Sequence, residues 1–222
     1  MRRLLNTRPL RILAWVLIAP YGLALLYWIV PPPSTLMLVD IFTLQFPRRD
    51  WVSLEEISPN LIASVVAAED GAFCDHFGFD FKQLEASFDR AERGRKLRGA
   101  STITQQTAKN LFLWNGRSWV RKILETPLAL WLEMMWSKKR ILEVYLNIAQ
   151  WGDNIYGAQA AARYHFATDA SKLSLTQSAL LAAALPNPVR RSAARPGSGQ
   201  LMQASIIVGR VARHTPDLSC VR

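Results

Sequence analysis

The chain has 222 residues, and half of them are hydrophobic, which is enough to bury one substantial core in a globular domain that carries an appendage. Its formal net charge is +10, so an anionic partner is expected. The membrane topology predicted below argues against DNA as that partner and leaves lipid head groups or a phosphate-bearing lipid.

An apolar run without a formal charge extends from Ile12 to Val30, and it predicts a transmembrane helix. Its 19 residues would span roughly 28 Å, close to the hydrocarbon thickness of a bilayer. Four arginines precede the run, and no Lys or Arg follows it until Arg48. We therefore expect residues 1–11 in the cytoplasm, residues 12–30 as the single span of a bacterial inner membrane, and the rest in the periplasm.

The alternative is a cleaved signal peptide. The apolar run is longer than a usual signal-peptide core, and residues 27–31 contain no pair of small residues at which a signal peptidase would cut. These two features favour an uncleaved anchor.

The chain after the anchor remains basic, because removing the four leading arginines leaves a net charge of +6. A basic domain beside a membrane favours anionic lipid head groups or a phosphate-bearing lipid over nucleic acid. A dense basic run lies within it and is either a solvated face or a head-group contact; its members are Arg90, Arg93, Arg95, Lys96 and Arg98.

Residues 31–50 begin with three prolines and contain few helix signals, so we expect an extended tether there, with the globular domain over residues 51–222. Ser58 and Pro59 indicate a helix start, with an N-cap hydroxyl followed by proline at the first helical position. This helix is apolar on nearly every side as far as Glu69, so it is expected to be buried. A carboxylate at the end of a helix lies near the negative pole of the dipole, which raises its pKa.

Helical periodicity dominates the rest of the domain. Apolar residues recur three and four apart in five segments, which are 119–135, 138–148, 156–164, 174–185 and 200–213. Ser174 and Gln177 form a capping box, and no run alternates with period two. The fold class is therefore predicted to be all-α. Pro127 is expected to kink the first of these segments just after Glu125.

The cysteines and histidines carry little information. Cys74 and Cys220 lie far apart in the sequence and no spacing links them, so we expect free thiols rather than a pair. The three histidines show no spacing typical of a metal site.

Five motifs occur in a fixed order. The first is Glu69-Asp70 with Phe73, His76, Gly78 and Asp80, and the second is Gly99-Ala-Ser-Thr-Ile-Thr-Gln-Gln-Thr-Ala-Lys109-Asn110. Both resemble the first two signatures of the peptidoglycan glycosyltransferases, which polymerise lipid II into glycan strands. The resemblance continues through Arg121-Lys122-Ile-Leu-Glu125, then Arg140 to Asn147 with Gly152 and Tyr156-Gly157, and finally Ala179 to Pro188. It covers about residues 58–190.

The resemblance implies a lysozyme-like helical fold preceded by the anchor. Little more than thirty residues follow the last motif, and no Ser-x-x-Lys sequence occurs, so the chain is similar to the monofunctional transglycosylases and is expected to carry no transpeptidase domain.

The resemblance also implies the site residues. Glu69 is expected to be the general base, with Lys109, Arg121 and Lys122 on the diphosphates. Glu125 is the second carboxylate, which orients Arg121 or helps to hold a divalent cation, Mg²⁺ or Mn²⁺; no organic cofactor is expected. Substrate hydrogen bonds are expected from Ser101, Thr102, Gln105 and Gln106, and support from Asp70, Phe73, His76, Asn110, Tyr145 and Asn147.

The expected partners are lipid II and the growing glycan strand, the membrane, and transpeptidases and division proteins. Two alternatives to polymerisation stay open. A lysozyme-like hydrolase or lytic transglycosylase would share the fold and use a glutamic acid, but it would not need three cations around a diphosphate. An inactive scaffold of the cell-wall synthesis complex is the other alternative, and the kink expected at Pro127 keeps it open.

Overall fold

The computed structural model of the chain describes residues 8–94, 101–116 and 118–222. The helices in this part are α1 (Arg8–Tyr27), α2 (Thr35–Phe42), α3 (Pro59–Glu69), α4 (Phe81–Glu92), α5 (Ile103–Phe112), α6 (Trp119–Met135), α7 (Lys138–Ile148), α8 (Ala158–Phe166), α9 (Leu175–Ala184) and α10 (Ser198–Arg213). Three short 3-10 helices join them, η2 (Leu54–Glu56), η3 (Ala170–Lys172) and η4 (Ser219–Val221). The all-α prediction is confirmed.

A small sheet interrupts the helical pattern. Its strands are β1 (Arg48–Arg49), β2 (Gln150–Gly152) and β3 (Ile155–Tyr156), in the order β1-β3-β2. β1 runs parallel to β3, and β2 runs antiparallel to it. These strands are too short to show alternation, which is why the periodicity of the sequence did not indicate them.

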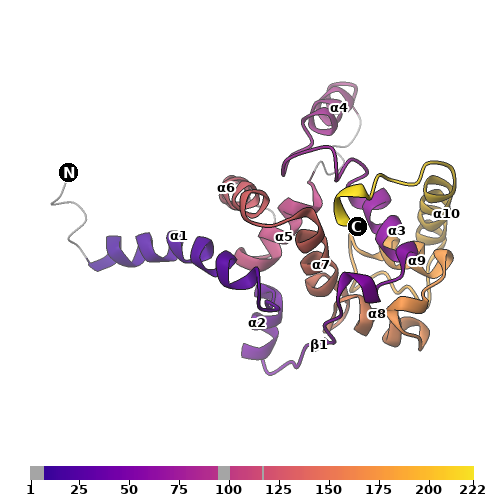
Figure 1. Cartoon of the computed structure of the whole chain (residues 1–222), viewed down its shortest axis with the longest axis horizontal. Helices are drawn as coiled ribbons and strands as arrows, with labels where there is room; N and C mark the ends of the chain where they lie inside the picture. The colour runs from indigo at the N-terminus through magenta and orange to yellow at the C-terminus, as the bar shows by residue number, and fades with distance from the viewer. Residues whose placement is uncertain (1–7, 95–100, 117) are drawn as a thin grey trace.

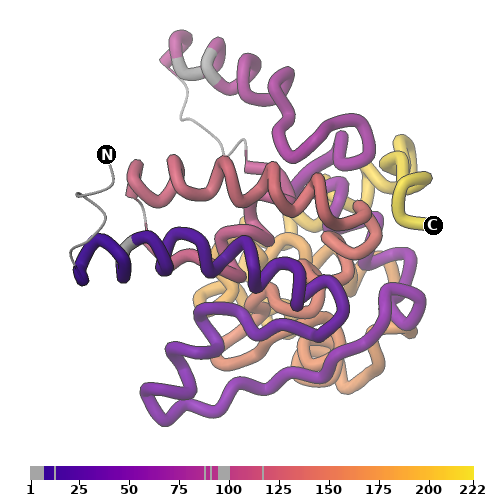
Figure 2. Tube along the Cα trace, turned by 60° about the vertical axis from the view of Figure 1, so that its left-hand side comes forward, coloured from indigo at the N-terminus to yellow at the C-terminus, as the bar shows by residue number. Residues whose placement is uncertain are grey.

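Helix α3 lies in the middle of the globular part and packs against α9 and α10, while α5 packs against α6 and α7 (Figure 1). Ser58 caps α3 and Pro59 occupies its first turn, as predicted. Every residue from Leu61 to Ala67 is buried, so α3 is a core helix that delivers Glu69 and Asp70 at its far end. Helix α4 stands at the edge of the domain (Figures 1 and 2).

Helix α1 is, within the described residues, the one helix long and apolar enough to cross a membrane. Most of it projects from the domain, but its second half lies beside α6 (Figure 2). The indole Nε1 of Trp131 donates to the carbonyl oxygen of Tyr21 at 3.2 Å, and that of Trp136 donates to the carbonyl of Ala24 at 3.0 Å. The helix is therefore docked on the domain rather than merely joined to it.

The segment after α1 differs from the extended tether that the sequence predicted, because residues 35–42 form helix α2. Ser34 caps this helix, and Thr35 Oγ1 donates to the carbonyl of Leu113 at 2.6 Å. The buried carboxylate of Asp40 accepts a hydrogen bond from the hydroxyl of Tyr156. The expectation of an extended chain is wrong for these residues, because tertiary contacts hold a helix that is short and has weak local signals.

Three further expectations concern the helix through Pro127, the cysteines and the basic run. Helix α6 runs unbroken from Trp119 to Met135 through Pro127, so the helix that presents Glu125 does not end there. The expectation of free cysteines is wrong, since Cys74 and Cys220 form a disulfide across 146 residues of sequence. Of the predicted basic run, Arg90 and Arg93 are exposed at the end of α4, and Arg95, Lys96 and Arg98 lie outside the described residues.

Candidate active site

Glu69 is the last residue of α3, and its half-buried carboxylate faces α5. Its Oε2 accepts a hydrogen bond from Gln106 Nε2 at 2.8 Å, and Gln106 Oε1 in turn accepts one from the Tyr145 hydroxyl at 3.1 Å. Burial raises the pKa of Glu69, and the negative charge of Asp70 raises it further, while Gln106 and Lys109 act in the opposite direction. The direction agrees with the expectation from the helix dipole, although burial is the main cause.

Asp70 is buried and joins three segments. It ends α3, its Oδ1 lies 2.9 Å from His76 Nε2, and its Oδ2 accepts the backbone N–H of Ile103 at 2.9 Å. Ile103 is the first residue of α5, so the carboxylate lies at the positive end of that helix. Asp70 thus ties the end of α3 to His76 and to the start of α5, and the supporting role expected of both residues stays a prediction.

Thr102 and Gln105 are buried and cap helix α5. Thr102 Oγ1 accepts the N–H of Gln105 at 3.2 Å and donates to the carbonyl of Gly78 at 2.7 Å, while Gln105 Oε1 accepts the N–H of Thr102 at 3.0 Å. Both side chains therefore support the start of α5, and their predicted contact with the substrate stays a prediction.

A cluster of charges lies at the start of α6. The carboxylate of Glu125 is buried and is bound on one oxygen by Arg121 Nη1 and on the other by Lys122 Nζ. Arg121 Nε also donates to the carbonyl of Gly116 at 3.0 Å, and Lys122 Nζ donates to Ser101 Oγ at 3.0 Å. Glu125 therefore holds both cations in place, and its expected role in orienting Arg121 on the substrate stays a prediction.

Lys109 connects this cluster with Glu69. Burial lowers the pKa of the Lys109 ammonium and so does the positive charge of Arg121, whereas the negative charges of Glu125 and Glu69 raise it. The two carboxylates and the three cations are thus close enough to interact. Within the described residues, the Lys109 ammonium makes no hydrogen bond or ion pair. This half-buried cation is therefore available to bind an anionic ligand.

The remaining supporting residues hold the backbone of the domain. Asn147 Nδ2 donates to the carbonyl of Val52 at 2.8 Å, and its Oδ1 accepts the N–H of the same residue at 3.0 Å. The backbone carbonyl of Asn110 accepts from Thr35 Oγ1 at 3.2 Å, which ties α5 to α2.

Sequence reasoning missed one buried ion pair beside the site. Lys138 Nζ lies 2.7 Å from Glu133 Oε1 and 4.5 Å above the ring of Phe73, and Glu133 Oε1 also accepts from Thr104 Oγ1 at 2.6 Å. The ammonium of this ion pair packs against the ring of Phe73, which is fully buried. The ion pair could have been predicted from Glu133, because an acidic residue in the apolar segment of α6 is expected to be buried and a buried acid needs a partner.

The arrangement does not fit a metal site built from protein side chains. Both oxygens of Glu125 are bound by cations, and the described residues contain no group of three or more His, Cys, Asp or Glu that could hold a metal ion. We derive no step through a metal ion.

The chain is similar in sequence to known proteins. The model of a family described as Transglycosylase matches residues 38–211. A biosynthetic peptidoglycan transglycosylase of Agrobacterium fabrum is 50% identical over 221 residues, which cover 99% of this chain and 98% of the relative. The proteins of the same name from Brucella suis and Rhizobium meliloti are 52% and 50% identical, over 96% and 93% of this chain and 96% and 88% of the relatives.

The helical domain, with carboxylates and cations gathered at the ends of α3, α5 and α6, defines an enzyme of the glycosyltransferase class. The chain belongs to the transglycosylase family, in which these relatives carry the name of biosynthetic peptidoglycan transglycosylase.

Proposed function

We propose that the protein polymerises lipid II into glycan strands, with inversion at the donor anomeric carbon and release of undecaprenyl diphosphate. The observation that carries the proposal is the position of Lys109, whose charge interacts with Glu69 on one side and with Arg121 and Glu125 on the other. A base and a set of cations within reach of one another are what the transfer of a sugar from a diphosphate requires.

In the proposed reaction a sugar hydroxyl of the acceptor loses its proton to Glu69 and attacks the anomeric carbon of the donor. The bond from that carbon to the diphosphate oxygen breaks, and the electron pair stays on the diphosphate. Because the nucleophile enters opposite the leaving group, the configuration inverts. A base works best when its pKa is near the working pH, so the burial that raises the pKa of Glu69 favours this role.

Arg121, Lys122 and Lys109 are proposed to bind the diphosphate as its negative charge increases. Arg121 presents a planar fork that suits phosphate oxygens, and its geometry is fixed by Glu125. The nearby Ser101 and Gln106 are proposed to contact the substrate. A divalent cation at this place would be held mainly by diphosphate oxygens, so the free protein should bind Mn²⁺ only weakly, and titration followed by electron paramagnetic resonance tests this.

The proposed location is the bacterial inner membrane, with α1 as a single span, the N-terminus in the cytoplasm and the domain in the periplasm. The length and apolar composition of α1 support the span. The disulfide supports an oxidising compartment for the domain, because such bonds persist outside the cytosol. Proposed partners are the transpeptidases that cross-link the product and division proteins.

The experiment is polymerisation of lipid II by the purified full chain in detergent, with Glu69→Gln as the test variant. We expect glycan polymer from the wild type and a loss of roughly 10²- to 10⁴-fold in the variant. Glu55→Gln, which changes an exposed carboxylate on η2, is the matched control and should keep its activity. Cleavage of purified glycan without polymer growth would instead identify a hydrolase or lytic enzyme, and near wild-type polymerisation by the Glu69 variant would refute the base.

A further inference from the structure

The loop of residues 71–80 follows Glu69 and Asp70 directly and is held on its inner side. Phe73 is fully buried beneath Lys138, and the backbone N–H of Phe73 donates to the carbonyl of Asp70 at 3.0 Å. His76 pairs with the Asp70 carboxylate, and the carbonyl of Gly78 accepts from Thr102. The position of the end of α3 therefore depends on how this loop is fixed.

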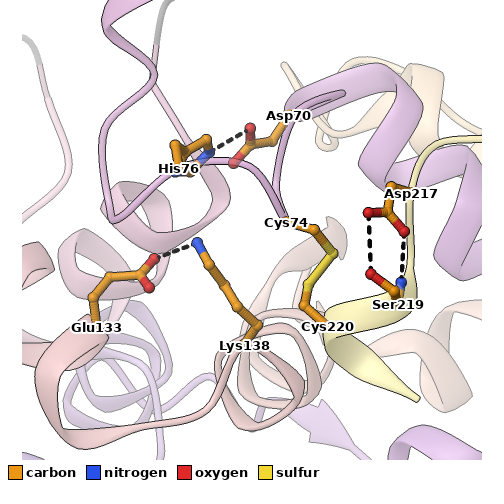
Figure 3. The surroundings of a disulfide bond; sticks show 8 residues. All are labelled: Asp70, Cys74, His76, Glu133, Lys138, Asp217, Ser219 and Cys220. Carbon is orange, nitrogen blue, oxygen red and sulfur yellow. Dashed lines mark hydrogen bonds and ion pairs between the residues drawn. A yellow bond between two sulfur atoms is a disulfide. The ribbon is translucent and has the colours of Figure 1, made fainter.

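The same loop is held on its outer side by the C-terminal segment. Cys74 is bonded to Cys220, with the two Cα atoms 5.6 Å apart (Figure 3). Cys220 belongs to η4, which packs against α7, and the neighbouring Val221 is buried. Asp217 fixes the turn before η4, because its carboxylate accepts the N–H and the hydroxyl of Ser219 at 2.8 and 3.0 Å.

We propose that the Cys74–Cys220 disulfide is a positioning element of the active site, which fixes the loop that holds Asp70 and, through Asp70, the carboxylate of Glu69. The inference rests on the proposed role of Glu69 as the base. Cys74 lies four residues after Asp70, and the bonds between them form a tight turn, so movement at Cys74 reaches Asp70 through few rotatable bonds. The disulfide fixes this turn to α7, the helix that also carries Tyr145, through η4.

The disulfide acts on the base rather than on the diphosphate site. Arg121 and Lys122 are held by Glu125, Ser101 and Gly116, and all three lie outside the loop and the C-terminal segment. Loss of the disulfide should therefore lower kcat and leave KM for lipid II almost unchanged. Small displacements of a catalytic group cost up to roughly 10²-fold in rate, and we expect about a tenfold fall in kcat with KM within about twofold.

Reduction provides a direct test, because both cysteines are only half-buried and a small dithiol can reach them. Dithiothreitol gives up two electrons and two protons and closes to its cyclic disulfide, and Cys74 and Cys220 become thiols. Reduced wild type should lose kcat, and reoxidation by oxidised glutathione should restore it. The Cys220→Ser variant should resemble the reduced protein and should not respond to dithiothreitol.

Circular dichroism and tryptophan fluorescence at the assay temperature separate positioning from folding. The double variant Cys74→Val with Cys220→Val fills the same space without a covalent bond. It replaces Cys220→Ser in the kinetic test if Cys220→Ser does not fold. A folded, reduced protein that keeps its kcat within twofold overturns the inference. So does a loss of activity that always accompanies a loss of helical signal, because that indicates a purely structural bond. If the oxidised wild type fails to polymerise lipid II, that result refutes the proposed function, and with it this inference, which rests on the proposed function.

Discussion

Replacing Gln106 by Met tests the environment of Glu69 without touching the carboxylate. Methionine has a similar length and is unbranched, but its side chain cannot donate the hydrogen bond that Gln106 Nε2 gives to Glu69 Oε2 at 2.8 Å. This bond stabilises the ionised carboxylate and counteracts the effect of burial, so its loss raises the pKa of Glu69 further. A general base must be ionised to act, so the acidic limb of the activity profile should move to higher pH.

The size of the pKa shift follows from the strength of the hydrogen bond that Gln106→Met removes. A hydrogen bond to a charged group contributes about 1.5–3 kcal/mol, which corresponds to a factor of roughly 10 to 150 in the population of the ionised form. Activity of Gln106→Met should fall by about this factor at pH values below the acidic limb. The part of the loss that comes from the raised pKa should disappear above the limb, where Glu69 is ionised again, and any loss that is independent of pH measures the proposed contact of Gln106 with the substrate. Glu69→Gln, in contrast, should recover at no pH.

The assay is the pH dependence of kcat/KM for lipid II polymerisation. Tyr145→Phe is the matched control, because it removes the partner on the other side of Gln106 and leaves the bond to Glu69 in place. Its acidic limb should stay where the wild-type limb is. The other charges that act on Glu69 are those of Asp70 and Lys109, and both variants retain them. An acidic limb in Gln106→Met that is unmoved, or moved to lower pH, would refute the reasoning.

Two further predictions concern the framework of the domain. Trp136→Phe removes the indole N–H that holds α1, so hydrogen exchange in residues 21–27 should speed up, whereas Trp119→Phe, at an exposed side chain, should leave it unchanged. Gly157→Ala forces a side chain onto a backbone with φ of +81° and places its Cβ 2.9 Å from the carbonyl oxygen of Asn147, so the free energy of unfolding in urea should fall by about 2 kcal/mol or more. Gly199→Ala, at an open position, should show no such loss.

Local signals predicted α3 and α6 to α10, whereas α4 and α5 were not among the predicted segments. The segments 119–135 and 138–148 agree residue for residue with α6 and α7, because strong apolar periodicity was bounded by Ser118 and Ser137. The burial of α3 followed from its lack of a polar face. The capping box of Ser174 and Gln177 is present as predicted.

Features that depend on distant contacts could not be predicted from local sequence. Helix α2 is stabilised by bonds to Leu113 and Tyr156, far along the chain. The disulfide forms because α10 leads the chain back to the loop after α3, which no cysteine spacing reveals. Thr102 and Gln105 were assigned to the substrate because hydroxyls and amides suit sugars; the same groups also suit a helix N-terminus, and their capping of α5 was not predicted.

Helix α6 links α1 to the proposed diphosphate site. Its first turns carry Arg121 and Glu125, and Trp131 near its end and Trp136 just after it donate to carbonyls of α1. Ten residues separate Arg121 from Trp131, which is about 15 Å along a helix. Under the proposed function, a rigid helix of this length between α1 and the cations ties the position of the diphosphate site to that of the helix proposed to span the membrane. The docking of α1 on α6 and the pairing of Arg121 with Glu125 would then act together to bring the cations to a lipid-linked substrate.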